Sequence, residues 1–157
     1  MLKIKYDNPN ENAHFISGIL QSVSETVSNN VKWLISELEL VPKYNGDYSP
    51  TGKNQNPDYA YHFTERIRNE HIVLCSGSEL RLALEESTSV RWGVFLGFLD
   101  KTSTDVDFYP TVEVEEIELI QHPLALIEIR IIDGDIIEIL SRDEEIISRI
   151  QNIIEKI

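Results

Sequence analysis

The pattern of apolar and charged residues is clearest in the last third of the chain, from residue 124 to residue 157. Two isoleucine-rich runs flank the tripeptide Asp133-Gly134-Asp135. β-Branched residues that alternate with charged residues are typical of half-buried strands, and the tripeptide has the composition of a turn. The pattern therefore predicts a β-hairpin.

The length of the turn decides which side chains share a face of this hairpin. A two-residue turn of Asp133 and Gly134 would mix charged and apolar side chains on both faces, whereas an odd-length turn separates them. An odd-length turn sends Glu128, Arg130 and Glu138 to one face, which we expect to point outward. The other face then carries Ile127, Ile129, Ile131, Ile137 and Ile139.

Two odd-length turns are compatible with the sequence. One places Gly134 in the left-handed conformation of a bulged turn. The other has all three residues from Asp133 to Asp135 in the loop and Arg130 opposite Glu138. The sequence does not choose between them.

A helix is predicted after the hairpin. Ser141 is the expected N-cap, and Glu144, three residues later, would complete a capping box. The isoleucines that follow have helical spacing, which predicts one apolar stripe. They are Ile146, Ile147, Ile150, Ile153, Ile154 and Ile157.

The first part of the chain predicts a strand and then a helix. Alternation from Leu2 to Asp7 indicates a short strand, and the helix should begin near Asn10 or Asn12. Residues 31–41 fit a bulged strand or a short helix, and we favour the strand. Residues 42–58 form a long connection rich in Asn, Gly, Pro and Tyr.

The middle of the chain predicts several more strands. Alternation predicts strands from Tyr59 to Phe63 and from His71 to Cys75. Residues 79–86 fit a strand after a turn, or a short helix with Ser76 as its cap. Trp92 to Phe98 is apolar on both faces, which indicates a central strand. Val112 to Ile120 has the pattern of a glutamate-striped strand.

Together these elements predict an α+β fold. We expect a largely antiparallel, twisted sheet of about eight or nine strands, with an N-terminal and a C-terminal helix packed on one face. The length of 157 residues suits a single domain that spans residues 1–157.

Composition adds a strong acidic bias. The chain has 14 basic and 27 acidic residues, a net charge of −13. Residues 100–157 hold 15 acidic and 5 basic residues, so most of the excess lies there. Such a field repels nucleic acid and anionic membranes and attracts basic partners. Solubility alone is the competing explanation.

The chain contains few features of an enzyme or a metal site. It has no glycine-rich phosphate loop and no nucleophile elbow, and its four histidines have no metal-ligand spacing. Cys75 is the only cysteine and fits a buried strand position. We expect no catalytic residues, no cofactor and no metal. The enzyme alternative is a small hydrolase with a site near His62 and the 42–58 loop.

The expected cellular location follows from the N-terminal residues and from the hydropathy of the chain. Met1 to Asp7 lacks the apolar stretch of a signal peptide, and no apolar run approaches the roughly 18 residues that span a bilayer. A cytoplasmic protein that does not bind membranes is therefore expected.

Acidic residues and tyrosines are the candidates for a partner-binding surface, because carboxylates steer a partner and tyrosines anchor it. They come from the glutamate-striped segment, the hairpin and the 42–58 loop. The candidates are Glu113, Glu115, Glu116, Glu118, Glu128, Asp133, Asp135, Glu138, Tyr44 and Tyr48.

In size, acidity and α+β pattern the chain resembles the small immunity proteins that neutralise bacterial toxins, many of which present acidic surfaces to basic nucleases. The resemblance lies in overall character and in acidic residues such as Glu115, Glu116 and Asp135. The strand from Trp92 to Phe98, followed by a hairpin and a helix, is also similar to small uncharacterised bacterial α+β proteins. Neither resemblance assigns a role to a residue.

The sequence thus favours a non-enzymatic binding protein that engages a basic protein, with an immunity or inhibitor role against a toxin domain as its sharpest form. A structural or self-associating domain is the first alternative, and the hydrolase is the second. The oligomeric state is left open.

Overall fold

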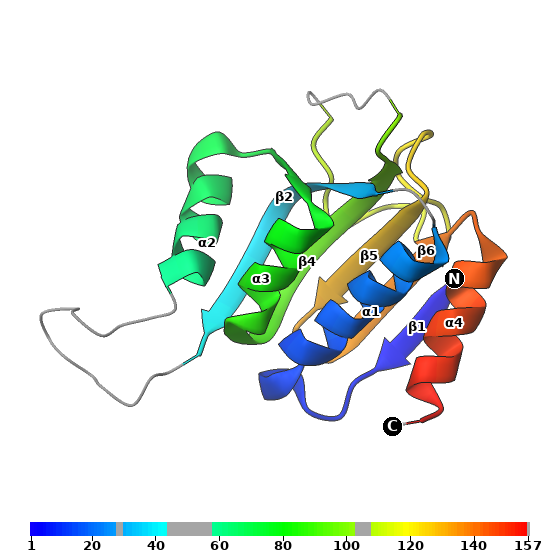
Figure 1. Cartoon of the computed structure of the whole chain (residues 1–157), viewed down its shortest axis with the longest axis horizontal. Coiled ribbons are helices and arrows are strands. Elements are labelled where there is room, and N and C mark those ends of the chain that lie inside the picture. The colour runs from blue at the N-terminus through cyan, green and yellow to red at the C-terminus, as the bar shows by residue number, and fades with distance from the viewer. Residues whose placement is uncertain (28–29, 44–57, 103–107, 157) are drawn as a thin grey trace, which may run out of the picture.

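The computed structural model describes residues 1–27, 30–43, 58–102 and 108–156. They form an α+β fold with one antiparallel sheet of six strands, in the order β1-β6-β5-β4-β2-β3, and four α-helices (Figure 1). The class is as predicted, but the sheet has fewer strands than eight or nine. In the described part of the chain, no helix is long and apolar enough to cross a membrane.

The strands are β1 (Leu2–Lys5), β2 (Val31–Pro42), β3 (Val73–Ser76), β4 (Ser87–Leu99), β5 (Ile127–Ile132) and β6 (Ile136–Ser141). The helices are the 3₁₀ turn η1 (Pro9–Glu11), α1 (Ala13–Thr26), α2 (Asp58–Glu70), α3 (Gly77–Glu85) and α4 (Glu144–Ile154).

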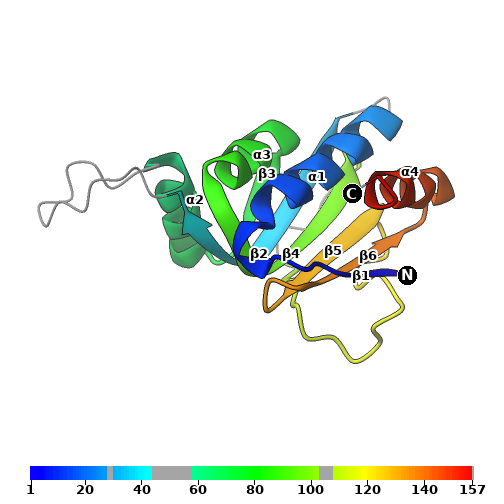
Figure 2. The same ribbon diagram turned by 90° about the horizontal axis from the view of Figure 1, so that it is seen from below.

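One face of the sheet packs against helices α1, α3 and α4 (Figure 2). We call it the helix-covered face. Its core contains the five hairpin isoleucines, together with Trp33 and Phe95 from the central strands, and all of them are buried. Gly97 leaves room for the side chains of Ile127 and Trp33 to pack over it, because a Cβ atom there would lie 2.6 Å from Ile127 Cγ2 and 3.0 Å from the Trp33 ring. The predicted all-isoleucine core face is therefore confirmed.

The other face of the sheet is covered by residues 108–126, which contain turns and bends (Figure 2, yellow). We call this segment the covering loop and the surface beneath it the loop-covered face. Part of that face is apolar: Leu34, Leu96 and Phe98 of the sheet pack against Ala125 of the loop. The sheet is thus buried on both sides.

The hairpin has the second of the two predicted registers. Arg130 pairs with Glu138 and Ile132 pairs with Ile136, so the loop contains all three residues from Asp133 to Asp135. Asp133 and Gly134 have φ angles of 52° and 79°, in the left-handed region.

The hairpin turn is tied to the first helix by a buried asparagine. Asn12 Nδ2 donates to the carbonyl oxygens of Gly134 (2.6 Å) and Val90 (2.8 Å), and Asn12 Oδ1 accepts from the Val90 amide (2.7 Å). Three backbone groups from β4 and the turn therefore have their partner on one side chain.

The other strand predictions had mixed outcomes. The strand for residues 31–41 is confirmed as β2, and its pairing with β4 is shifted three times between Ile35 and Pro42. Trp92 to Phe98 lies in β4, which pairs with β2 and β5 and is therefore central. For residues 79–86 the helix alternative is correct, since Ser76 Oγ caps α3 by accepting from the Glu79 amide (3.1 Å).

Two predicted strands are wrong. Tyr59 to Phe63 belongs to α2, whose buried side chains Ala60, Phe63 and Ile67 have helical spacing. The short aromatic alternation has a period of two, and helix packing outweighed it. Residues 112–120 belong to the covering loop rather than to a strand.

The predicted N-cap of the last helix is also wrong. Asp143, not Ser141, caps α4, and its Oδ1 accepts from the Glu145 amide (2.9 Å). Ser141 is the last residue of β6. The apolar stripe is confirmed where it is described: Ile146 and Ile150 are buried, and Ile147, Ile153 and Ile154 pack against the core. Ile157 lies outside the described residues.

Candidate protein-binding surface

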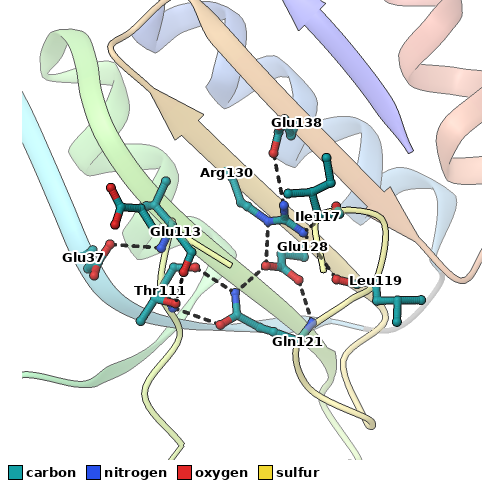
Figure 3. Close-up of polar contacts among 10 residues, drawn as sticks. Glu37, Thr111, Glu113, Ile117, Leu119, Gln121, Glu128, Arg130 and Glu138 are labelled. Atoms are coloured by element: carbon teal, nitrogen blue, oxygen red, sulfur yellow. Dashed lines mark hydrogen bonds and ion pairs between the residues drawn. The ribbon is translucent and has the colours of Figure 1, made fainter. Parts of the chain in front are cut away.

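Three charged side chains of the hairpin form an ion triad beneath the covering loop (Figure 3). Arg130 Nε lies 2.9 Å from Glu128 Oε1, and Arg130 Nη1 lies 3.1 Å from Glu138 Oε2. The side chains of Arg130 and Glu128 are fully buried, and that of Glu138 is 6% exposed. Buried charges need such partners, because burial removes their hydration.

This geometry corrects one prediction. The parity argument placed Glu128, Arg130 and Glu138 together on one face, and they do share it. We expected that face to point outward, whereas the covering loop buries it. The two glutamates are therefore absent from the exposed surface, apart from the small exposed part of Glu138.

Arg130 also holds the covering loop in place. Its Nη2 donates to the carbonyl oxygens of Ile117 (3.1 Å) and Leu119 (3.3 Å) (Figure 3). A guanidinium carries five N–H donors in a fixed planar arrangement, so it can bind two carboxylates and two carbonyls at once. One buried side chain thus connects β5, β6 and the loop.

Gln121 links the triad to the start of the loop. Its backbone amide donates to Glu128 Oε2 (2.9 Å), and its Nε2 donates to Glu128 Oε1 and to the Thr111 carbonyl (3.0 Å). Its Oε1 accepts from the Thr111 amide (2.9 Å). The two bonds with Thr111 join residue 111, near the start of the loop, to residue 121, near its end.

Glu37 of β2 makes a further attachment. Its Oε2 accepts from the Val112 amide (3.1 Å) and from the Trp92 indole Nε1 (3.0 Å). The hydroxyl of Ser36 donates to the Pro110 carbonyl. The loop is therefore fixed to β2 as well as to the hairpin, and the same carboxylate of Glu37 also binds Trp92 of β4.

The outer surface of the loop combines carboxylates with apolar side chains. The predicted residues Glu113, Glu115, Glu116 and Glu118 are all exposed on it. The large exposed apolar side chains of the loop are Tyr109 (47%), Ile117 (50%), Leu119 (58%) and Leu124 (56%). Ile117 and Leu119 lie next to the glutamates in the chain, so the structure presents both kinds of group on one segment.

A groove of about 430 Å³ opens where the loop meets the hairpin. Trp92, Ile117 and Ile132 contribute apolar surface to it. Its charged lining residues are Glu113, Glu115, Glu138 and Arg130, and the last two are paired with each other in the triad. The structure therefore brings three predicted site residues from two elements to one concave surface.

The remaining predicted residues lie apart from this groove. Asp133 is exposed and Asp135 half-buried in the hairpin turn, and neither lines the groove. Tyr44 and Tyr48 lie outside the described residues. The structure thus gathers the glutamates of the loop without including the predicted tyrosines.

His62 and His122, among the described residues, do not line this groove. His62 is exposed on α2, where its ring contacts the ring of Tyr61 (5.6 Å between centroids). His122 is buried between the rings of Phe98 and Phe108, and its Nδ1 accepts from the Leu124 amide (3.1 Å). Among the described side chains, no group of three or more His, Cys, Asp or Glu could hold a metal ion.

Cys75 lies in the core of the helix-covered face, opposite Trp33 in the β2–β3 pair. Burial raises the pKa of its thiol from 9.0 to about 12, and the negative charge of Glu79 adds to the effect. A thiol with so high a pKa is a poor nucleophile at neutral pH.

Sequence reasoning missed Trp92 and Gln121, which shape and hold the loop surface, and it placed Arg130 on the outside. A signal for the buried second face was present, because Leu96 and Phe98 of the central strand are apolar on the side opposite Phe95. A strand that is apolar on both faces requires cover on both.

Comparisons with protein-family models, curated proteins and solved structures found no match to this chain.

Proposed function

We propose that this protein binds a basic partner protein through the outer surface of the covering loop. The observation that carries the proposal is the combination on that loop of exposed carboxylates, such as Glu115 and Glu116, with exposed apolar side chains such as Ile117 and Leu119. Exposed apolar groups within a polar rim are characteristic of interaction sites.

The attachment of the loop supports this role. Its backbone is held by Arg130, Gln121 and Glu37, so the outer side chains are displayed on a fixed frame. A preorganised surface loses less conformational entropy when a partner binds. The loop loses its conformational entropy during folding rather than when the partner binds.

The charge of the chain supports a basic partner. Residues 100–157 contain 15 of the 27 acidic residues, and the net charge of the whole chain is −13. Such a field speeds the encounter with a positively charged surface and disfavours acidic competitors. The sharpest version is an immunity or inhibitor protein that neutralises a basic toxin, because nucleases present positive surfaces to their substrates.

The test is a pull-down from lysate, followed by titration of the captured protein against salt. A variant with Glu113, Glu115, Glu116 and Glu118 all changed to glutamine should bind the partner at least about tenfold more weakly. A matched control removes four exposed charges elsewhere, with Asp7→Asn, Glu25→Gln, Glu144→Gln and Glu155→Gln. The control should keep most of the affinity.

Binding that does not weaken as salt rises, or that falls equally in both variants, contradicts the proposal. For the immunity version, the purified protein should inhibit the enzymatic activity of its captured partner at an equimolar ratio. A partner that stays fully active in the complex removes that version and leaves only the binding role.

A further inference from the structure

The groove between the covering loop and the hairpin has a chemically mixed lining. Trp92, Ile117 and Ile132 provide apolar surface, and Glu113 and Glu115 provide exposed carboxylates. Glu138 lines the groove together with its triad partner Arg130, so three glutamates and one arginine give the lining a net charge of −2. A neutral apolar occupant would remove water from the Glu113 and Glu115 carboxylates without supplying a counterion, which is costly. A small cation without an apolar stem would leave the apolar lining uncovered. The lining thus suits a side chain that is both apolar and cationic.

Glu138 lines the groove with two cations already beside its carboxylate. In the triad one positive charge, on Arg130, faces two negative charges, on Glu128 and Glu138. Arg130 binds Glu138 through Oε2, and the nearest cation to Oε1 in the ion pairs of the described residues is Lys3 Nζ, at 3.6 Å. The Lys3 side chain is 57% exposed, so solvent screens this pair. Each oxygen of Glu138 therefore already faces a cation, and Glu113 and Glu115 are the groove carboxylates that an incoming cation can contact.

Trp92 offers a fixed aromatic surface. Its indole nitrogen donates to Glu37 Oε2 (3.0 Å), which orients the ring, and the side chain is half-buried. A cation over an indole ring is attracted by the ring quadrupole, most strongly when water is partly excluded. The carboxylate of Glu37 also adds negative charge beside the ring.

We infer that this groove binds an arginine side chain of the basic partner, with the guanidinium against Trp92 and beside the exposed carboxylates of Glu113 and Glu115. Arginine fits better than lysine because its planar guanidinium both stacks on aromatic rings and bridges several carboxylates. Its aliphatic stem covers Ile117 and Ile132. The inference rests on the proposed function and names the anchor residue for it.

The experiment uses the two indole N–H signals of the intact protein in ¹H–¹⁵N spectra. Trp33 is 1% exposed in the core, whereas Trp92 lines the groove, and a Trp92→Phe variant assigns the signals. The probe is a short peptide with one arginine between two leucines. The matched peptide carries citrulline, which has nearly the same shape without the charge.

The arginine peptide should shift the Trp92 signal in a saturable way and leave the Trp33 signal in place. The lysine version should bind more weakly, and the citrulline version at least about tenfold more weakly. The Lys3→Met variant should bind the arginine peptide about two- to fivefold more tightly, because it removes a positive charge beside Glu138, which lines the groove.

Glu113→Gln/Glu115→Gln is the test variant, and Glu116→Gln/Glu118→Gln is its control, since neither control residue lines the groove. Both variants remove two charges from the same loop, and the test variant should weaken peptide binding at least about fivefold more than the control does. Equal shifts with arginine and citrulline, equal loss in both variants, or no saturable shift up to about 10 mM peptide each overturn the inference.

These outcomes separate the inference from the proposed function. If the two variants weaken the protein partner equally, loop charge steers the partner, and only the groove inference fails. If the arginine peptide binds the groove but no basic protein responds to the loop substitutions, the groove inference stands and the proposed function fails.

Discussion

The two faces of the β5–β6 hairpin come from alternating residues of the same two strands and are buried in different ways. On the helix-covered face, isoleucines pack beneath α1 and α4. On the loop-covered face, Glu128, Arg130 and Glu138 are buried beneath a segment whose secondary structure is limited to turns and bends. Alternation along two short strands therefore places an apolar core and a buried ion triad on opposite faces of the same sheet.

The difference lies in what each face requires of its cover. Apolar burial is non-directional, so a helix with one apolar stripe satisfies it in many arrangements. A buried charge needs donors or acceptors at hydrogen-bond distance and in the right direction. The covering loop meets that need with its own backbone, at Ile117, Leu119 and Gln121. The polar face thus fixes the shape of the loop.

The largest expected effect comes from removing the centre of the triad. Arg130→Met should lower the free energy of unfolding by about 3–5 kcal/mol, because Glu128 then remains buried without a counterion and Glu138 keeps only the exposed Lys3. Denaturant unfolding measures the loss. The surface control Arg149→Met breaks the exposed pair with Glu145 (3.3 Å) and should cost about 0.5 kcal/mol or less.

A triple variant sharpens this comparison. Glu128→Leu, Arg130→Met and Glu138→Leu together remove all three charges and should recover most of the lost stability, since apolar residues of similar volume often replace buried ion pairs without loss. The loop should nevertheless lose its attachment at Ile117 and Leu119. A loss of less than about 1 kcal/mol in Arg130→Met alone would contradict the account of the loop-covered face.

A smaller effect is expected for the reactivity of Cys75, which lies in the core of the helix-covered face. The raised pKa of Cys75, about 12, means that the thiolate fraction at neutral pH is about 1000-fold lower than for a thiol with a pKa of 9.0. Alkylation of the native protein by iodoacetamide should therefore be slower than alkylation of the unfolded chain by at least that factor. Similar rates in the two states would show that solvent reaches this face.

The raised pKa of Cys75 also makes the stability of the protein depend on pH. Folding raises the pKa of Cys75, so its contribution to stability is complete below pH 9 and is lost as the pH rises toward about 12. The Cys75→Ala variant should lack this part of the alkaline decline. Identical alkaline curves for the two proteins would show that Cys75 is not desolvated.

The sequence predicted the elements whose side-chain pattern is both periodic and long enough to be unambiguous. The three-residue turn was among two predicted alternatives, because only an odd-length turn places Ile129 with Ile139 on one face and Arg130 with Glu138 on the other. The Trp92–Phe98 strand was predicted as central because it is apolar on both faces. Tyr59 to Phe63 failed because five residues cannot distinguish a period of two from the helical spacing of Ala60, Phe63 and Ile67.

The candidate surface was predicted only in part. The exposed glutamates of residues 113–118 were named correctly as solvent-facing groups, but as part of a strand. Nothing in the local pattern indicates that Gln121 binds Glu128 or that Glu37 binds Trp92, because these partners are far apart in sequence or lie in irregular structure. The groove depends on such contacts, so periodicity alone does not reveal it.

Hydrogen exchange of the loop amides tests most directly whether the covering loop is a fixed binding surface. The amides of Thr111, Val112 and Gln121 donate to side-chain oxygens of Gln121, Glu37 and Glu128 respectively. We expect each to exchange at least about 100-fold more slowly than an unstructured peptide, equivalent to about 2.7 kcal/mol of opening free energy.

Gln121→Ala provides the matched variant, because it removes the acceptor of the Thr111 amide and leaves the acceptors of the α1 amides unchanged. Protection should fall at Thr111 and stay constant in α1. If all three loop amides of the native protein exchange at the rate of an unstructured peptide while the sheet stays protected, the loop is not held by the buried triad. The proposed surface then has no fixed frame.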